Sequence, residues 1–171
     1  VPIVAMEPAV KPAARATKTG VVGVLATVGT LNSAKFAALL DQFATDVTVV
    51  TQPGVGLVEQ VEAGDIDGPH THELVKERIA PMLEAGADVI VLGSTHFHFL
   101  RALVQEVAGQ GVTVIDTGAA VARRLAGVLE AEHIATTGTG ATAYWTSGDP
   151  GTISEVVSKL TGKSVTAKAL P

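Results

Sequence analysis

The chain has 171 residues, 47% of them hydrophobic and 17% charged, and a formal net charge of −5, which predicts a globular domain or one domain plus part of another. This charge argues against a nucleic-acid surface, no apolar run approaches the roughly 18 residues of a membrane span, and zero cysteines exclude disulfides and thiolate metal sites. We expect a cytoplasmic location, since no signal peptide is visible, and Val1 instead of Met indicates a fragment or a processed product.

Predicted strands and helices alternate along the chain, which indicates the α/β class with a mainly parallel sheet that is doubly wound. In the first half we expect strands over residues 1–5, 21–26 and 47–50, and helices over 8–17, 31–43, 57–63 and 71–84. In the second half we expect strands over 89–92, 112–115, 133–136, 143–146 and 164–168, and helices over 97–107, 119–129 and 150–160.

The composition of the chain shifts near Glu132, because the later strands are weaker and richer in Thr and Gly. We therefore expect residues 1–116 to form one doubly wound α/β domain. Residues 117–171 are expected to be a segment that returns to, or packs on, another domain.

Three polar residues, Ser94, Thr95 and His96, directly follow the strand expected over 89–92. That strand is an unbroken aliphatic run, the pattern of a strand buried on both faces of a parallel sheet. Open α/β sheets bind ligands at the carboxyl ends of such strands, and the next helix offers free N–H groups to an anion. A catalytic or binding role is therefore one interpretation, and a helix cap, which needs one hydroxyl and no histidine, is the other.

Further polar residues are expected at the same edge of the sheet. Thr27, Thr30 and Ser33 follow the second expected strand and could form another anion-binding loop, although their positions favour helix capping. Asp116 and Thr117 follow the strand expected over 112–115, where an ordinary turn and a functional role are equally favoured.

Histidines spaced by two residues raise the question of a metal site. His70 and His72 lie in what reads as a polar linker beside acidic residues, but no third ligand with sensible spacing is evident, so a solvated linker is favoured. Glu59 lies on a short helix that could face the edge of the sheet, although a lone glutamate is usually solvated. The sequence therefore predicts no metal site.

The stretch around Ser94 resembles a known family. Residues 91–97, Val-Leu-Gly-Ser-Thr-His-Phe, are similar to the second catalytic motif of the glutamate racemases, Leu-Gly-Cys-Thr-His-Tyr. Ordered matches along nearly the whole chain are far more specific than one motif, so the chain is identified as a member of that family. The other segments that resemble it, in the same order, are residues 1–12, 23–33, 57–59, 115–122 and 136–138.

The resemblance implies two similar α/β domains with the active site in the cleft between them, one domain being completed by the returning C-terminal segment. It implies interconversion of L- and D-glutamate without a cofactor, by two thiols that remove and replace the α-proton, which supplies D-glutamate for peptidoglycan. The family motifs Asp-Ser-Gly-X-Gly-Gly and Cys-Asn-Thr-Ala are missing, so the chain resembles the C-terminal portion of such an enzyme.

The resemblance also implies roles for single residues. Ser94 occupies the position of a catalytic thiol, and His96 that of the histidine which assists it. A free thiol has a pKa of about 8.5, whereas an alcohol is far more weakly acidic, so this chain alone is expected to be inactive. The implied substrate-binding positions are Thr95, Thr27, Thr30, Ser33 and Glu59.

Other features leave alternatives open. The family's Tyr-Pro after the histidine is Phe97-His98 here, so the local geometry is expected to differ. A non-catalytic module that binds a small carboxylate or a protein is the alternative function, and a racemase for aspartate or another amino acid fits the order of motifs less well. The expected partners are glutamate and either a second copy or the missing N-terminal part, with no nucleic acid, membrane, metal or cofactor.

Overall fold

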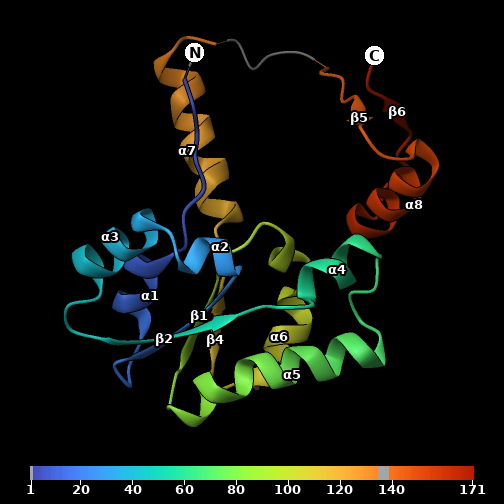
Figure 1. Ribbon diagram of the computed structural model, residues 1–171. Coiled ribbons are helices and arrows are strands. Elements are labelled where there is room, and N and C mark those ends of the chain that lie inside the picture. The colour runs from blue at the N-terminus through green and yellow to red at the C-terminus, as the bar shows by residue number, and fades with distance from the viewer. Residues whose placement is uncertain (1, 135–138) are drawn as a thin grey trace.

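The computed structural model describes residues 2–134 and 139–171, and at its centre lies a four-stranded parallel sheet (Figure 1). Each neighbouring pair of strands is parallel, as the alternation of strands and helices predicts. The strands, in the order β2-β1-β3-β4 across the sheet, are β1 (Val21–Ala26), β2 (Thr48–Pro53), β3 (Val89–Leu92) and β4 (Thr113–Ile115).

Helices cover both faces of this sheet, which confirms the doubly wound α/β class. On one face, Val22 and Val24 of β1 and Val91 of β3 pack with α1 (Val10–Ala16) and α3 (Ala34–Phe43). The alternate residues of the same strands, such as Leu25, Ile90 and Leu92, pack on the other face. The helices there are α4 (Leu57–Glu62), α5 (Pro69–Glu84) and α6 (Arg101–Ala108).

The chain leaves the sheet through α7 (Gly118–Ala131), which rises beside the N-terminal segment (Figure 1). Within the described part of the chain, α7 has no residue with a buried side chain. The last elements are β5 (Tyr144–Thr146), α8 (Pro150–Thr161) and β6 (Ala167–Ala169), and β5 and β6 pair in parallel in a second, two-stranded sheet. Leu160 of α8 packs against the core beside α4 and α5.

Some predicted elements are wrong at their ends or in kind. Of the described residues, 2–9 form neither helix nor strand; a strand needs a partner, and Ile3 is 88% exposed. The helix expected over 31–43 begins only at Ala34, as α3, because Ser33 accepts a hydrogen bond from Phe36 N at 3.1 Å and caps it. A separate short helix, α2 (Val28–Leu31), precedes it.

Two further corrections concern histidines. His70 and His72 both lie in α5, so the linker interpretation is wrong. His72 falls within the helix expected over 71–84, and His70 joins it because Pro69 suits the first position of a helix and starts α5 two residues earlier. His133, expected at the start of a strand, lies in a turn with a φ of 52°. Residues 135 and 136 of the strand expected over 133–136 lie outside the described residues. So does the segment 136–138, which resembles the family.

No helix in the described ranges is long and apolar enough to cross a membrane. The segment expected as a helix over 97–107 begins as the 3₁₀ helix η1 (His96–Leu100) and continues as α6. This short helix carries His96, so its position decides where the imidazole lies.

Candidate functional site

The segments that follow β1, β2 and β3 lie side by side at the carboxyl edge of the sheet. Gly93 N donates a hydrogen bond to Leu25 O at 2.8 Å, and Gly54 N donates one to Ala26 O at 2.9 Å. The polar residues after Ala26 and after Gly93 are therefore neighbours, as the parallel arrangement requires.

Two glycines allow this close approach. A Cβ atom on Gly93 would lie 2.9 Å from Ala26 Cβ, and one on Gly54 would collide with the ring of Phe97. Phe97 is fully buried beneath the edge and lies in η1, directly after His96. The packing of Phe97 against Gly54 therefore holds η1 against the core.

Ser94, Thr95 and His96 lie together at the end of β3. Ser94 is half-buried, Thr95 is exposed, and the His96 side chain is 36% exposed. Ser94 Oγ accepts a long hydrogen bond from His96 N at 3.4 Å. Ser94 thus accepts a hydrogen bond from the start of η1, as the capping interpretation expects. The Thr95 side chain and the His96 imidazole remain accessible to solvent at the ends of the strands, where such sheets bind ligands.

A carboxylate that the sequence did not single out contacts the imidazole. His96 Nε2 lies 3.2 Å from Oε1 of Glu62, the last residue of α4. Glu59, which was singled out, is exposed three residues earlier on the same helix. The local pattern could have suggested Glu62, because Leu57 and Val61 are the buried positions of α4 and leave both glutamates on its polar side.

The hydroxyls of Thr27 and Ser33 cap α2 and α3, as their positions favour, whereas Thr30 lies within α2 and its hydroxyl contacts that of Thr27. Thr27 Oγ1 lies 3.0 Å from Thr30 Oγ1 and accepts from Thr30 N at 3.3 Å, while Ser33 Oγ donates to Thr30 O at 2.7 Å. The same three residues line a cavity of about 440 Å³ beside Glu7 and Lys35, whose side chains form an ion pair at 2.7 Å. Capping and contact with a bound ligand are therefore compatible at these positions.

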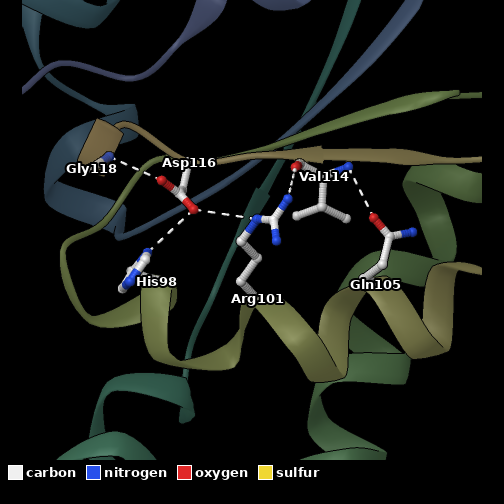
Figure 2. Close-up of polar contacts among 6 residues, drawn as sticks. All are labelled: His98, Arg101, Gln105, Val114, Asp116 and Gly118. Atoms are coloured by element: carbon white, nitrogen blue, oxygen red, sulfur yellow. Dashed lines mark hydrogen bonds and ion pairs between the residues drawn. The ribbon is translucent and has the colours of Figure 1, made fainter. Parts of the chain in front are cut away.

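Asp116, at the end of β4, forms the best-connected polar group of the edge (Figure 2). Its Oδ2 lies 3.2 Å from His98 Nδ1 and 3.3 Å from Arg101 Nε, and its Oδ1 accepts from Gly118 N at 2.9 Å. From the sequence, an ordinary turn and a functional role were equally favoured at Asp116. The structure shows a turn, and the Asp116 carboxylate also contacts the side chains of His98 in η1 and Arg101 in α6.

Within the ranges that the structure describes, no three His, Asp or Glu side chains form a group that could hold a metal ion. His70 and His72 extend from α5. The edge of the sheet thus offers an imidazole paired with a carboxylate, with hydroxyls around it. Such a pair can take up and release a proton, whereas the Ser94 alcohol is a weak acid and a poor source of a reactive anion.

Comparison of the chain with known proteins identifies its family. The family model described as Asp/Glu/Hydantoin racemase matches residues 1–125. A glutamate racemase of Stutzerimonas stutzeri is 50% identical over 170 residues, which cover 99% of this chain and 64% of that protein. A glutamate racemase of Pseudomonas aeruginosa is 55% identical over 163 residues, which cover 95% of this chain and 62% of that protein.

A solved structure agrees with the sequence comparisons. The crystal structure of Escherichia coli glutamate racemase in complex with L-glutamate and the activator UDP-MurNAc-Ala matches with a TM-score of 0.80 and 30% identity. The match covers 96% of this chain and 63% of that one, so this chain spans less than two thirds of the proteins that it resembles. On the match of the family model and on these identities, the chain belongs to the Asp/Glu/Hydantoin racemase family.

Proposed function

We propose that the full-length protein is built as a glutamate racemase, whose reaction interconverts L- and D-glutamate by moving the α-proton without a cofactor and supplies D-glutamate for peptidoglycan. In this proposal Ser94, which stands in place of the thiol, leaves the protein with little of that activity. The observation that carries this proposal is the identity of 50% over 99% of the chain to a protein named glutamate racemase. The grouping of Ser94, Thr95 and His96 at the carboxyl edge of a parallel sheet supports it, because substrates of such folds bind there.

The side chains of the edge take separate roles in this proposal. Ser94 stands where a thiol base would stand, and the pair of His96 and Glu62 moves the proton to and from that position. The hydroxyl of Thr95 and the exposed carboxylate of Glu59 would contact the substrate. Further hydroxyls assigned to substrate binding are those of Thr27, Thr30 and Ser33.

In the proposed arrangement, residues 1–116 form one domain and residues 117–171 belong to a second, similar domain that needs chain outside this sequence. The support is that β5 and β6 pair apart from the main sheet and that α7 buries no side chain in the described part of the chain. The missing part, or a second copy of the chain, would cover this segment. Synthesis of a peptidoglycan precursor places the activity in the cytoplasm.

The test is exchange of the α-proton of D- and L-glutamate in deuterated water, followed by NMR on the full-length protein and on its Ser94→Cys form. We expect exchange in the Cys form and a rate lower by orders of magnitude in the Ser form, since an alcohol is a far weaker acid than a thiol. A Cys form that has exchange with neither enantiomer would overturn the proposal.

The alternative is a module that binds a small carboxylate or a protein without catalysis. It is the less favoured reading, because the relatives on which the proposal rests are named as racemases. Calorimetric titration with glutamate separates the two: binding in both forms together with no exchange in either would leave the binding module as the function.

A further inference from the structure

One face of η1 and α6 is joined to the strand β4 by polar side chains (Figure 2). His98, Arg101 and Gln105 are spaced by three and four residues, so they lie along one side of the helical segment. Arg101 Nη2 donates to Val114 O at 3.3 Å, and Gln105 accepts from Val114 N at 3.4 Å. In the described sheet β4 is an edge strand, so the backbone groups on its outer side have no neighbouring strand. Arg101 and Gln105 form hydrogen bonds with the backbone of Val114 in place of such a strand.

Asp116 terminates this polar face at the end closest to the candidate site. Its carboxylate is 15% exposed and takes contacts from His98, Arg101 and the backbone of Gly118. It therefore joins the end of β4 to three other elements, namely η1, α6 and α7. Loss of its charge would release two of these three contacts.

The helix η1 is held by carboxylates on two different sides. A 3₁₀ helix has about three residues per turn, so His96 and His98 point in different directions. His96 meets Glu62 of α4, whereas His98 meets Asp116 after β4, and the buried ring of Phe97 lies between them in sequence. Rotation of η1 about its axis would break one of these contacts, so Asp116 resists movement of the His96 imidazole.

We propose that Asp116 is a positioning residue for the reaction. Through His98 and Arg101 it holds η1 so that the His96 imidazole keeps its place beside Glu62. This inference rests on the proposed function, because it assigns to Asp116 an effect on the proton transfer at that same site. Asp116 is not required to touch the substrate.

The test compares Asp116→Asn with Asp88→Asn, both in the full-length protein that carries Ser94→Cys. Asparagine still accepts from Gly118 N but loses the charge that attracts His98 and Arg101. Asp88 is a matched control, because it also accepts several hydrogen bonds. It lies before β3, at the amino-terminal ends of the strands, whereas the candidate site lies at their carboxyl ends. We expect Asp116→Asn to lower kcat for α-proton exchange about 10- to 100-fold with KM nearly unchanged, and Asp88→Asn to change neither.

A second measurement needs no activity. Hydrogen exchange of the peptide that spans η1, followed by mass spectrometry, should be faster in Asp116→Asn and unchanged in Asp88→Asn. An unchanged kcat in Asp116→Asn overturns the inference, and so does an unchanged exchange of η1. If the parent Ser94→Cys protein has no activity, the proposed function fails, and the exchange of η1 alone then decides whether Asp116 holds this helix.

Discussion

Glu59 and Glu62, three residues apart on α4, differ in their contact with the His96 imidazole. Both side chains are exposed, but Glu62 lies 3.2 Å from the His96 imidazole, whereas no such contact is found for Glu59 among the described residues. A carboxylate beside an imidazole fixes the orientation of the ring, which a proton-transfer step requires. The difference between the two positions can therefore be measured by the same substitution at each.

We predict that Glu62→Gln lowers kcat for α-proton exchange in the full-length Ser94→Cys protein by about 10-fold or more, since the amide cannot balance a protonated imidazole. Glu59→Gln is the matched control on the same helix and should act mainly on KM. Rates are read from NMR spectra in deuterated water. Equal losses of kcat in the two variants would contradict a specific role for Glu62.

Asp88 shows how a single carboxylate joins segments that are distant in sequence. It accepts hydrogen bonds from Lys18 N at 2.7 Å, from Thr19 N at 3.3 Å and from the Thr17 and Thr19 hydroxyls. Burial by itself raises the pKa of Asp88, but these hydrogen bonds outweigh it and lower the pKa from 3.8 to about 2.

We predict that Asp88→Asn lowers the free energy of unfolding by about 1 kcal/mol at neutral pH, a value discounted for partial exposure to solvent. The folded-state pKa is depressed, so the contribution is complete above 3.8 and is lost as the pH falls through about 2. Urea unfolding of both proteins between pH 7 and pH 2 checks this. The prediction fails if the difference between them stays constant over that range.

At the scale of elements, the contact between Gly54 and Phe97 connects β2 to η1. A methyl group on Gly54 would overlap the Phe97 ring, which lies in a fully packed part of the core. The ring can move only by shifting η1, and η1 carries His96.

We predict that Gly54→Ala lowers the free energy of unfolding by about 1 to 3 kcal/mol and reduces activity, because overpacking displaces η1. The control is Gly127→Ala in α7, where no described atom lies within 4 Å of the new Cβ atom. That variant should gain about 0.5 to 1 kcal/mol, since alanine favours a helix interior. Thermal unfolding and α-proton exchange measure both effects, and equal behaviour of the two variants would be inconsistent with the packing argument.

The elements themselves could be predicted to different degrees. The strands β1 and β3 match their predicted ranges, because their mainly aliphatic residues mark strands buried on both faces of a sheet. The start of the helix expected over 31–43 was placed too early, because a side-chain cap at Ser33 leaves the apolar periodicity intact. The strand expected over 1–5 was wrong for its described residues, because pairing with a sheet is not a local property of a segment.

At the scale of the whole molecule, the last part of the chain has little core of its own. Trp145 is 52% exposed and Leu170 is 56% exposed, and β5 and β6 have three residues each. Two-stranded sheets of this size are marginal in water unless another element covers them.

We predict that backbone amides of residues 139–171 exchange with deuterium faster than those of 21–115 when this 171-residue chain is studied alone, because fewer apolar contacts hold them. Exchange followed by mass spectrometry measures the difference. Slower exchange in the C-terminal segment would show that it forms a stable unit without further chain.

The sequence by itself determined the α/β class, the buried strands, the polar residues at their carboxyl ends and the resemblance to the racemases. These properties follow from periodic burial and from motifs whose residues are adjacent in the chain. Tertiary structure decided that Glu62 meets His96 across 34 residues and that Asp116 meets His98 and Arg101. Such contacts depend on how helices cross the sheet, and the crossing geometry is set by the packing of the whole core.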